Sequence, residues 1–255
     1  LKFMKDLLKG HKIVALVYGF ACHGIFLLAG TVMYFSILTG FKYSIGSLEG
    51  IYAIIMNFLL LIQFPFFHSF LLSGAGMRVL DKFGPREYAR SLRTTIYATF
   101  ASLQLLGLFC FWSYSGIIMW EIPYPYSLIM IFLNLCSWLL LTTSSIQAGY
   151  QVQTGSLGWT SLYKNKRPEF PDMPVKGLFS IVRQPIYISF IFVLWSTPNM
   201  SADLFTVSIF YTGYCFLGPF LKERRFHKIY GKRFLIYKSR VPYFFPAIVK
   251  KRVNN

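Results

Sequence analysis

Long apolar runs separated by short basic segments form the main pattern of this 255-residue chain. Five runs contain no Asp, Glu, Lys or Arg and come close to the roughly 20 apolar residues with which a helix crosses a bilayer. They are residues 13–39, 51–72, 94–114, 127–148 and 204–221. A sixth run, 186–198, is too short to cross upright by itself. We therefore expect an all-α polytopic membrane protein with about six transmembrane helices, the fifth and sixth forming a helical hairpin.

The composition supports a membrane protein. Hydrophobic residues make up 55% of the chain and charged residues 14%, whereas an average soluble domain carries about 25% charged residues. This excludes a disordered chain, a coiled coil and most soluble enzymes. The net charge of +17 could indicate nucleic acid, but the basic residues are confined to short segments between the apolar runs. Membrane topology explains that charge, and we expect no nucleic-acid partner.

The distribution of Lys and Arg predicts the orientation, because these residues concentrate on the cytoplasmic side. Six spans with an internal N-terminus place every Lys and Arg inside except Lys42. A five-span arrangement would move whole basic clusters outside. We therefore expect both termini and a C-terminal helical segment in the cytoplasm, with lipids as surroundings. A bacterial inner membrane is the first expectation; endoplasmic reticulum or inner nuclear membrane is the alternative.

Two polar clusters lie at the predicted cytoplasmic ends of spans, where chemistry is possible beside such apolar helices. His68 lies near the inner end of the second span and could exchange a proton near neutral pH, or could be an interfacial histidine. Arg93 and Tyr97 are four residues apart on one helical face at the start of the third span. Arg93 could equally be a membrane anchor whose side chain reaches the headgroups.

A third polar cluster spans residues 177–246. Pro185 suits the first turn of a helix, which places Arg183 just before that helix and Tyr187 in its first turn. The predicted hairpin returns Glu223 to the same membrane face. Arg183 and Glu223 can thus meet at the cytoplasmic end of these helices, at the opening of one site. The alternative is a surface ion pair with a basic membrane-binding tail.

This third cluster resembles the C-terminal half of the integral-membrane methyltransferases, such as isoprenylcysteine carboxyl methyltransferase and phospholipid methyltransferase. The family pattern is Arg-His-Pro-x-Tyr, a hairpin, Glu-Glu-Arg, Tyr-Gly, Tyr and a terminal Val-Pro. The matching residues here are Arg183-Gln184-Pro185-Ile186-Tyr187, Glu223-Arg224, Tyr230-Gly231, Tyr237 and Val241-Pro242. The resemblance implies a core over 51–255, with 177–246 binding the cofactor, preceded by an N-terminal segment with the first span over 1–50.

Within that superfamily, the chain most resembles methanethiol S-methyltransferase and the nurim and NnrU-like proteins. Residues 194–201 resemble the hairpin tip of that group, Trp-Ala-Thr-Pro-x-Met-Thr. His68-Ser69 matches its second-span His-Ser, and residues 93–97 resemble its Arg-Ser-x-Tyr. The likeness implies methylation of a small thiol, with methanethiol converted to dimethyl sulfide.

The resemblance also implies S-adenosylmethionine as the cofactor and no metal. Arg183 would bind the cofactor carboxylate, and Glu223 its ammonium or a ribose hydroxyl. The other implied cofactor residues supply hydrogen bonds and aromatic walls: Gln184, Pro185, Tyr187, Tyr230 and Tyr237. The implied substrate pocket contains Trp195 and Tyr214.

The implied catalytic residues are His68, Arg93 and Tyr97. His68 would take the thiol proton, Arg93 would stabilise the thiolate, and Tyr97 would line the same cavity.

Two departures from the family pattern keep other functions open. Gln184 stands where the family has His, and Lys222 stands where the first Glu of the pair is expected. One alternative is a methyltransferase for a lipid or an isoprenylcysteine carboxylate. A second is a non-catalytic, nurim-like structural protein. A transporter is disfavoured because the sequence shows no inverted repeat and no acidic residue in mid-span.

Overall fold

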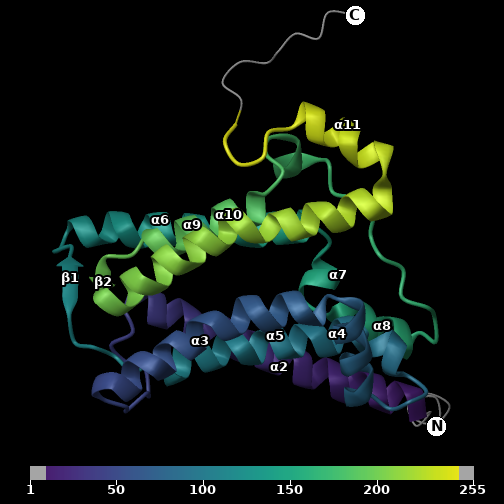
Figure 1. Ribbon diagram of the computed structural model, residues 1–255, viewed down its shortest axis with the longest axis horizontal. Coiled ribbons are helices and arrows are strands. Elements are labelled where there is room, and N and C mark those ends of the chain that lie inside the picture. The colour runs from purple at the N-terminus through teal and green to yellow at the C-terminus, as the bar shows by residue number, and fades with distance from the viewer. Residues whose placement is uncertain (1–9, 247–255) are drawn as a thin grey trace, which may run out of the picture. The chain divides into compact units, whose positions relative to one another are not determined.

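The computed structural model describes residues 10–246, which are mostly helical (Figure 1). Among these residues, five helices are long and apolar enough to span a membrane. They are α2 (Gly10–Leu38), α3 (Gly50–Leu71), α5 (Ala89–Phe111), α6 (Tyr126–Gln147) and α10 (Ala202–Tyr230). A shorter apolar helix, α9 (Pro185–Trp195), precedes α10. The prediction of a polytopic all-α membrane protein is confirmed.

Short elements connect these helices. The helical ones are α4 (Gly74–Leu80), η1 (Asp81–Phe83), α7 (Tyr150–Gln153), α8 (Ser156–Tyr163), η2 (Gly177–Ser180) and α11 (Lys232–Arg240). The strands β1 (Ile118–Glu121) and β2 (Asn199–Ser201) form an antiparallel pair in which Trp120 lies opposite Met200. The hairpin tip is thus extended backbone.

The apolar side chains of the long helices are largely exposed on the protein. In α3, for example, Ile51, Tyr52, Ile54 and Phe58 are each more than half exposed. Contiguous apolar surface of this extent is rare on a soluble monomer. It is the surface that a helix presents to lipid, and this agrees with the span lengths.

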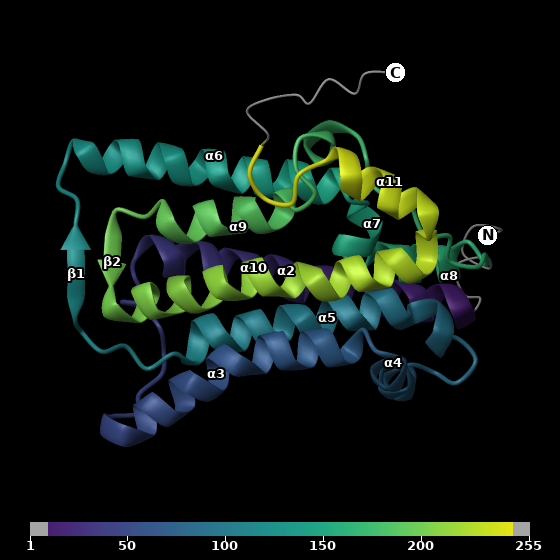
Figure 2. The ribbon, with the colours of Figure 1, turned by 45° about the horizontal axis from the view of Figure 1, so that its top comes forward.

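The chain forms two compact units. Of the described residues, the first unit contains 10–123, 150–171 and 198–207, and the second contains 124–149, 172–197 and 208–246. In the first unit α5 lies between α2 and α3, and α8 packs on α2 and α5 (Figure 2). In the second unit α6 lies beside α9.

Trp159 fixes α8 onto the helices of the first unit. Its indole Nε1 donates a hydrogen bond to Nε2 of His23 at 3.0 Å. The hydroxyl of Thr95 accepts from the Trp159 backbone N–H at 2.9 Å and donates to the Gly155 carbonyl at 2.6 Å. Gly19 of α2 leaves the room that the Trp159 ring occupies. In an apolar surrounding these polar groups are costly unless paired, so they hold α8 at a defined place.

A buried carboxylate anchors the start of α10 in the first unit. Asp203 accepts hydrogen bonds from Trp112 Nε1 at 2.8 Å and from the backbone N–H and hydroxyl of Ser115 at 2.9 and 2.7 Å. A buried charge needs such partners. Asp203 therefore ties the first turn of α10 to the segment after α5.

The second unit contains α9 and residues 208–230 of α10, which form most of the predicted hairpin. Helix α9 begins at Pro185, which satisfies the first-turn position that suits proline. Trp195 at its end donates from Nε1 to the Thr212 hydroxyl of α10 at 3.0 Å. The apolar run of α10 ends at residue 221, but the helix continues to Tyr230. Residues 222–226 are therefore presented at helical spacing.

We expect Gly19→Ala to destabilise the protein. A Cβ at this position would lie 2.7 Å from the Trp159 ring, and overpacking of this kind costs about 1–3 kcal/mol. Thermal unfolding in detergent micelles measures the effect. Gly24→Ala is the matched control, because it lies in the same helix and its Cβ would meet nothing within 4 Å. Equal unfolding temperatures for the two variants would contradict this account of α8 docking.

Candidate functional site

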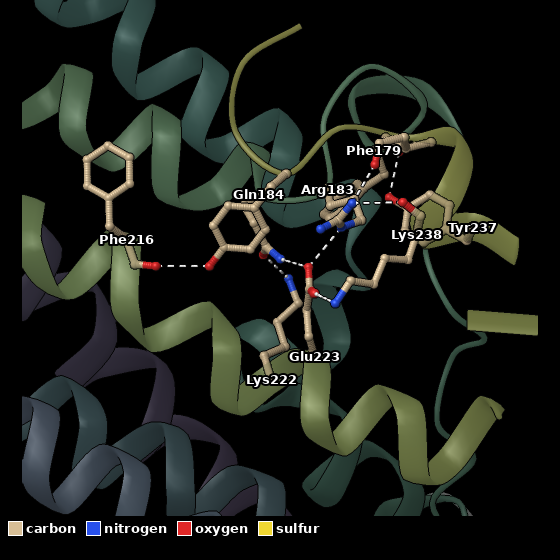
Figure 3. A network of polar contacts seen from close by, with 10 residues as sticks. Phe179, Arg183, Gln184, Phe216, Lys222, Glu223, Tyr237 and Lys238 are labelled. Carbon is tan, nitrogen blue, oxygen red and sulfur yellow. Dashed lines mark hydrogen bonds and ion pairs between the residues drawn. The ribbon is translucent and has the colours of Figure 1, made fainter. Parts of the chain in front are cut away.

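The second unit brings Arg183 and Glu223 into direct contact (Figure 3). Arg183 lies between η2 and α9, and its Nε donates to Oε1 of Glu223 in α10 at 2.8 Å. The two residues are 8% and 5% exposed. A pair of this kind, removed from water, is stable only when its remaining hydrogen-bonding groups are also satisfied.

Arg183 also holds the end of α11. Its Nη1 donates to the carbonyls of Lys238 and Val241 at 3.0 and 2.6 Å, and its backbone N–H donates to the Pro242 carbonyl at 2.9 Å. Arg183 therefore joins the start of α9, the C-terminal third of α10 and the segment that ends α11.

Tyr237 provides a second link, which joins α11 to η2 beside Arg183. Its hydroxyl donates to the Phe179 carbonyl of η2 at 2.6 Å. Burial raises the pKa of Tyr237 to about 12; the Glu223 carboxylate also raises it, and Arg183 opposes this rise. Tyr237 therefore stays a neutral hydrogen-bond donor at physiological pH.

Glu223 is the centre of a wider network (Figure 3). Its Oε1 also accepts from Gln184 Nε2 at 3.0 Å, and its Oε2 lies 3.3 Å from Lys238 Nζ. The other end of the Gln184 amide, Oε1, accepts from Lys222 Nζ at 2.9 Å. The amide of Gln184 thus connects a carboxylate on one side with an ammonium on the other.

This network borders a small cavity. The cavity has a volume of about 10 Å³, and residues from η2, α9, α10, α11 and the loop before η2 line it. The lining residues are Pro174, Phe179, Arg183, Gln184, Lys222, Glu223, Phe226, Phe234 and Tyr237. Small-molecule sites are typically about 300–1,000 Å³. A nucleoside-sized ligand therefore requires some of these side chains to move.

Four of the cofactor residues implied by the resemblance line this cavity: Arg183, Gln184, Glu223 and Tyr237. Pro185 begins the adjoining helix, and the ring of Tyr187 lies 5.5 Å from Lys222 Nζ.

Tyr230, Trp195 and Tyr214 are not among the lining residues. The ring of Tyr230 packs edge-on against Phe226, with centroids 5.4 Å apart. The ring of Tyr214 packs against Tyr211 at 6.3 Å.

Five contributors to the network and the cavity were not predicted from the sequence: Pro174, Phe179, Phe226, Phe234 and Lys238. A signal for Phe226 was available, since it follows Lys222 by four residues and so shares its face of a continuous helix. Phe179 and Lys238 are brought in by the loop before α9 and by α11. No short-range pattern marks such contacts.

In the first unit, His68 of α3 and Tyr97 of α5 meet. The Tyr97 hydroxyl lies 2.8 Å from Nε2 of the imidazole. The Phe64 ring stacks on His68 with centroids 4.8 Å apart. The two helices thus present a group that can exchange a proton together with a hydroxyl that can orient it.

Arg93 is engaged by a carboxylate. Its Nε and Nη2 donate to the two oxygens of Asp81 in η1, both at 2.6 Å. These hydrogen bonds from Arg93 hold the pKa of Asp81 below its usual range. The charge of Arg93 is therefore balanced by a neighbour, and its first role is to anchor η1 to α5.

The fold and the site define an integral-membrane helical protein with a buried ion pair beside an aromatic-lined cavity. No family model matches the chain, and no solved structure matches it.

Curated relatives do match it, over most of its length. The chain is 28% identical over 245 residues to methanethiol S-methyltransferase 1 of Bradyrhizobium diazoefficiens, covering 92% of this chain and 83% of the relative. It is 24% identical over 245 residues to methanethiol S-methyltransferase of a Pseudomonas species, covering 92% and 91%. It is 24% identical over 233 residues to methanethiol S-methyltransferase of Mycobacterium tuberculosis, covering 85% and 94%. These similarities support the resemblance to the integral-membrane methyltransferases that the sequence motifs indicate.

We expect Arg183→Lys to loosen α11. Lysine cannot reproduce the fork that bonds Glu223 and two carbonyls, and hydrogen bonds to charged groups contribute about 1.5–3 kcal/mol each. Hydrogen–deuterium exchange of residues 232–242 should accelerate by about tenfold or more.

Arg233→Lys is the control for this substitution. It changes the same residue types in α11, but its partner Asp172 is exposed, so little stability is at stake. Exchange in Arg183→Lys that matches exchange in Arg233→Lys would show that Arg183 does not hold this segment.

Proposed function

We propose that this protein transfers a methyl group from S-adenosylmethionine to methanethiol, forming dimethyl sulfide. The observation that carries the proposal is the similarity to proteins named methanethiol S-methyltransferase across 92% of this chain. In the reaction the thiol loses its proton, its sulfur bonds the methyl carbon, and the bond from that carbon to the donor sulfur breaks. The products are dimethyl sulfide, S-adenosylhomocysteine and a proton.

The donors around the cavity suit the amino-acid end of this cofactor. Arg183 would hold its carboxylate, for which a planar guanidinium is well shaped. Glu223 would hold its ammonium or a ribose hydroxyl. Arg183 and Glu223 form an ion pair with each other at 2.8 Å. A zwitterionic ligand would replace this pair by two new ion pairs, one between its carboxylate and Arg183 and one between its ammonium and Glu223. When bound, the cofactor supplies an electrophilic methyl group on a sulfonium. We propose residues 177–246 as the cofactor-binding part.

Tyr187, Phe226 and Phe234 would contribute aromatic surface to the bound ligand. Their rings come from α9, α10 and α11, and the last two line the cavity. The cavity of about 10 Å³ must widen to admit a nucleoside. Movement of α11, which is fixed to the site mainly by Arg183 and Tyr237, is the simplest way to widen it.

His68 is our proposed base for the thiol proton. The Tyr97 hydroxyl lies within 2.9 Å of both ring nitrogens, so it can orient the imidazole, which exchanges a proton near neutral pH. The thiolate, and not the thiol, is the effective nucleophile. Tyr97 would thus orient His68, whereas Arg93, whose charge Asp81 balances, would stabilise the thiolate only by giving up part of that pairing.

The Lys and Arg distribution supports a topology with both termini in the cytoplasm. We propose a bacterial inner membrane as the location. A small uncharged thiol can reach a site at the inner face from either water or lipid.

The function is tested with purified protein in lipid nanodiscs. Calorimetry measures binding of S-adenosylmethionine and S-adenosylhomocysteine, and methyl-labelled cofactor is then supplied with methanethiol or, separately, with a lipid extract. We expect labelled dimethyl sulfide in the headspace of the first mixture. Label found only in the lipid fraction would show that the methyl acceptor is a lipid and not methanethiol. If the protein binds neither nucleoside, the proposal that it is a methyltransferase is refuted.

We expect His68→Ala to lower turnover by about 10²–10⁴-fold, the usual contribution of a positioned acid or base. Affinity for the cofactor should stay unchanged, and calorimetry measures it in parallel with headspace product. Tyr97→Phe should lower turnover less. His11→Ala, which removes a histidine near the start of α2, is the control. A normal rate in His68→Ala would remove this residue from the mechanism.

A further inference from the structure

Lys222 occupies an unusual position for a lysine in this fold. Its Nζ lies 5.7 Å from the ring centroid of Phe179, 5.5 Å from that of Tyr187 and 5.6 Å from that of Phe226. A cation within about 6 Å of an aromatic face is attracted by the ring quadrupole. Three rings from η2, α9 and α10 therefore surround one ammonium, and we call Phe179, Tyr187 and Phe226 the aromatic cage.

The hydrogen bonding of Lys222 supports this reading. Its ammonium donates to the amide oxygen of Gln184 at 2.9 Å. The neighbouring carboxylate of Glu223 is occupied by Arg183 and Lys238 at 2.8 and 3.3 Å. The Glu223 carboxylate also attracts the charge of Lys222, but the groups in contact with this ammonium are π faces and one neutral acceptor. Such an environment also suits a sulfonium or a quaternary ammonium.

The cage adjoins the proposed cofactor residues. Phe179 and Phe226 line the same cavity as Arg183 and Glu223, and Lys222 lines it with them. A ligand whose amino-acid end is held by Arg183 and Glu223 would bring its sulfur close to these rings. Two cations cannot share one cage without strong repulsion in a partly buried place.

We propose that Lys222 is a specificity-determining residue, an internal cation that occupies the aromatic cage and competes with the sulfonium of the methyl donor. It sets the affinity of the site for cationic S-adenosylmethionine relative to neutral S-adenosylhomocysteine. This inference rests on the proposed function. Methyl transfer removes the sulfonium charge, so the repulsion ends when the product forms.

Calorimetry of both nucleosides tests the inference without any turnover. The measured quantity is the dissociation constant of S-adenosylmethionine divided by that of S-adenosylhomocysteine. Lys222→Met removes the charge at similar length, and we expect this ratio to fall by about tenfold or more, because repulsion between close charges acts on one ligand only. Lys222→Arg keeps a cation and should keep the ratio near that of the native protein.

Lys238→Met is the matched control. Lys238 is a second cation of the same network and contacts Glu223, but it lies outside the aromatic cage. Its removal should leave the ratio within about threefold of the native value, because a half-exposed charge is screened by water. An equal fall in Lys238→Met would assign the effect to net charge and overturn the role of the cage.

The remaining outcomes separate this inference from the proposed function. If Lys222 instead binds the cofactor carboxylate, Lys222→Met weakens both ligands equally and the inference fails alone. If Lys222→Met strengthens the binding of both ligands equally, the aromatic cage binds the ammonium group of the ligand and not its sulfonium. The inference fails in this case too. If native protein and variants bind neither nucleoside, the proposed function fails and the inference fails with it.

Discussion

The buried pair of Arg183 and Glu223 is the interaction on which the second unit depends. Two charges withdrawn from water cost several kcal/mol each unless partners compensate them. Here the guanidinium is satisfied by a carboxylate and two backbone carbonyls, and the carboxylate receives Arg183, Gln184 and Lys238. The pair therefore fixes α9, α10 and the end of α11 together. A ligand that replaced one partner would loosen the same contacts, so binding and local order are physically linked.

The long spans were predictable because the absence of charge over about 20 residues is a strong constraint in a bilayer. The run 51–72 became Gly50–Leu71, and the run 127–148 became Tyr126–Gln147. The run 204–221 was extended to Tyr230. Hydropathy cannot show that extension, since helix formation continues through polar residues once the first turns exist. The extension places Lys222, Glu223 and Phe226 on one helix.

The site was predictable only in part. Pro185 and the hairpin were sufficient to suggest that Arg183 and Glu223 lie near each other. The sequence could not show that several cations compete for one carboxylate, because partner choice depends on distances of a few tenths of an ångström in the folded chain. It also could not show that Asp81 binds Arg93, since the intervening turn of η1 decides that contact.

The two departures from the family motif, Gln184 and Lys222, form one chemical unit. The amide of Gln184 donates to Glu223 and accepts from Lys222. An amide keeps this donor–acceptor polarity at every pH, whereas an imidazole that took up a proton would present two donors and face the ammonium with a second cation. A cation at position 222 is therefore best accompanied by an uncharged residue at position 184. Gln184 and Lys222 are therefore chemically compatible neighbours, and the network that they join is the one we propose to hold the cofactor.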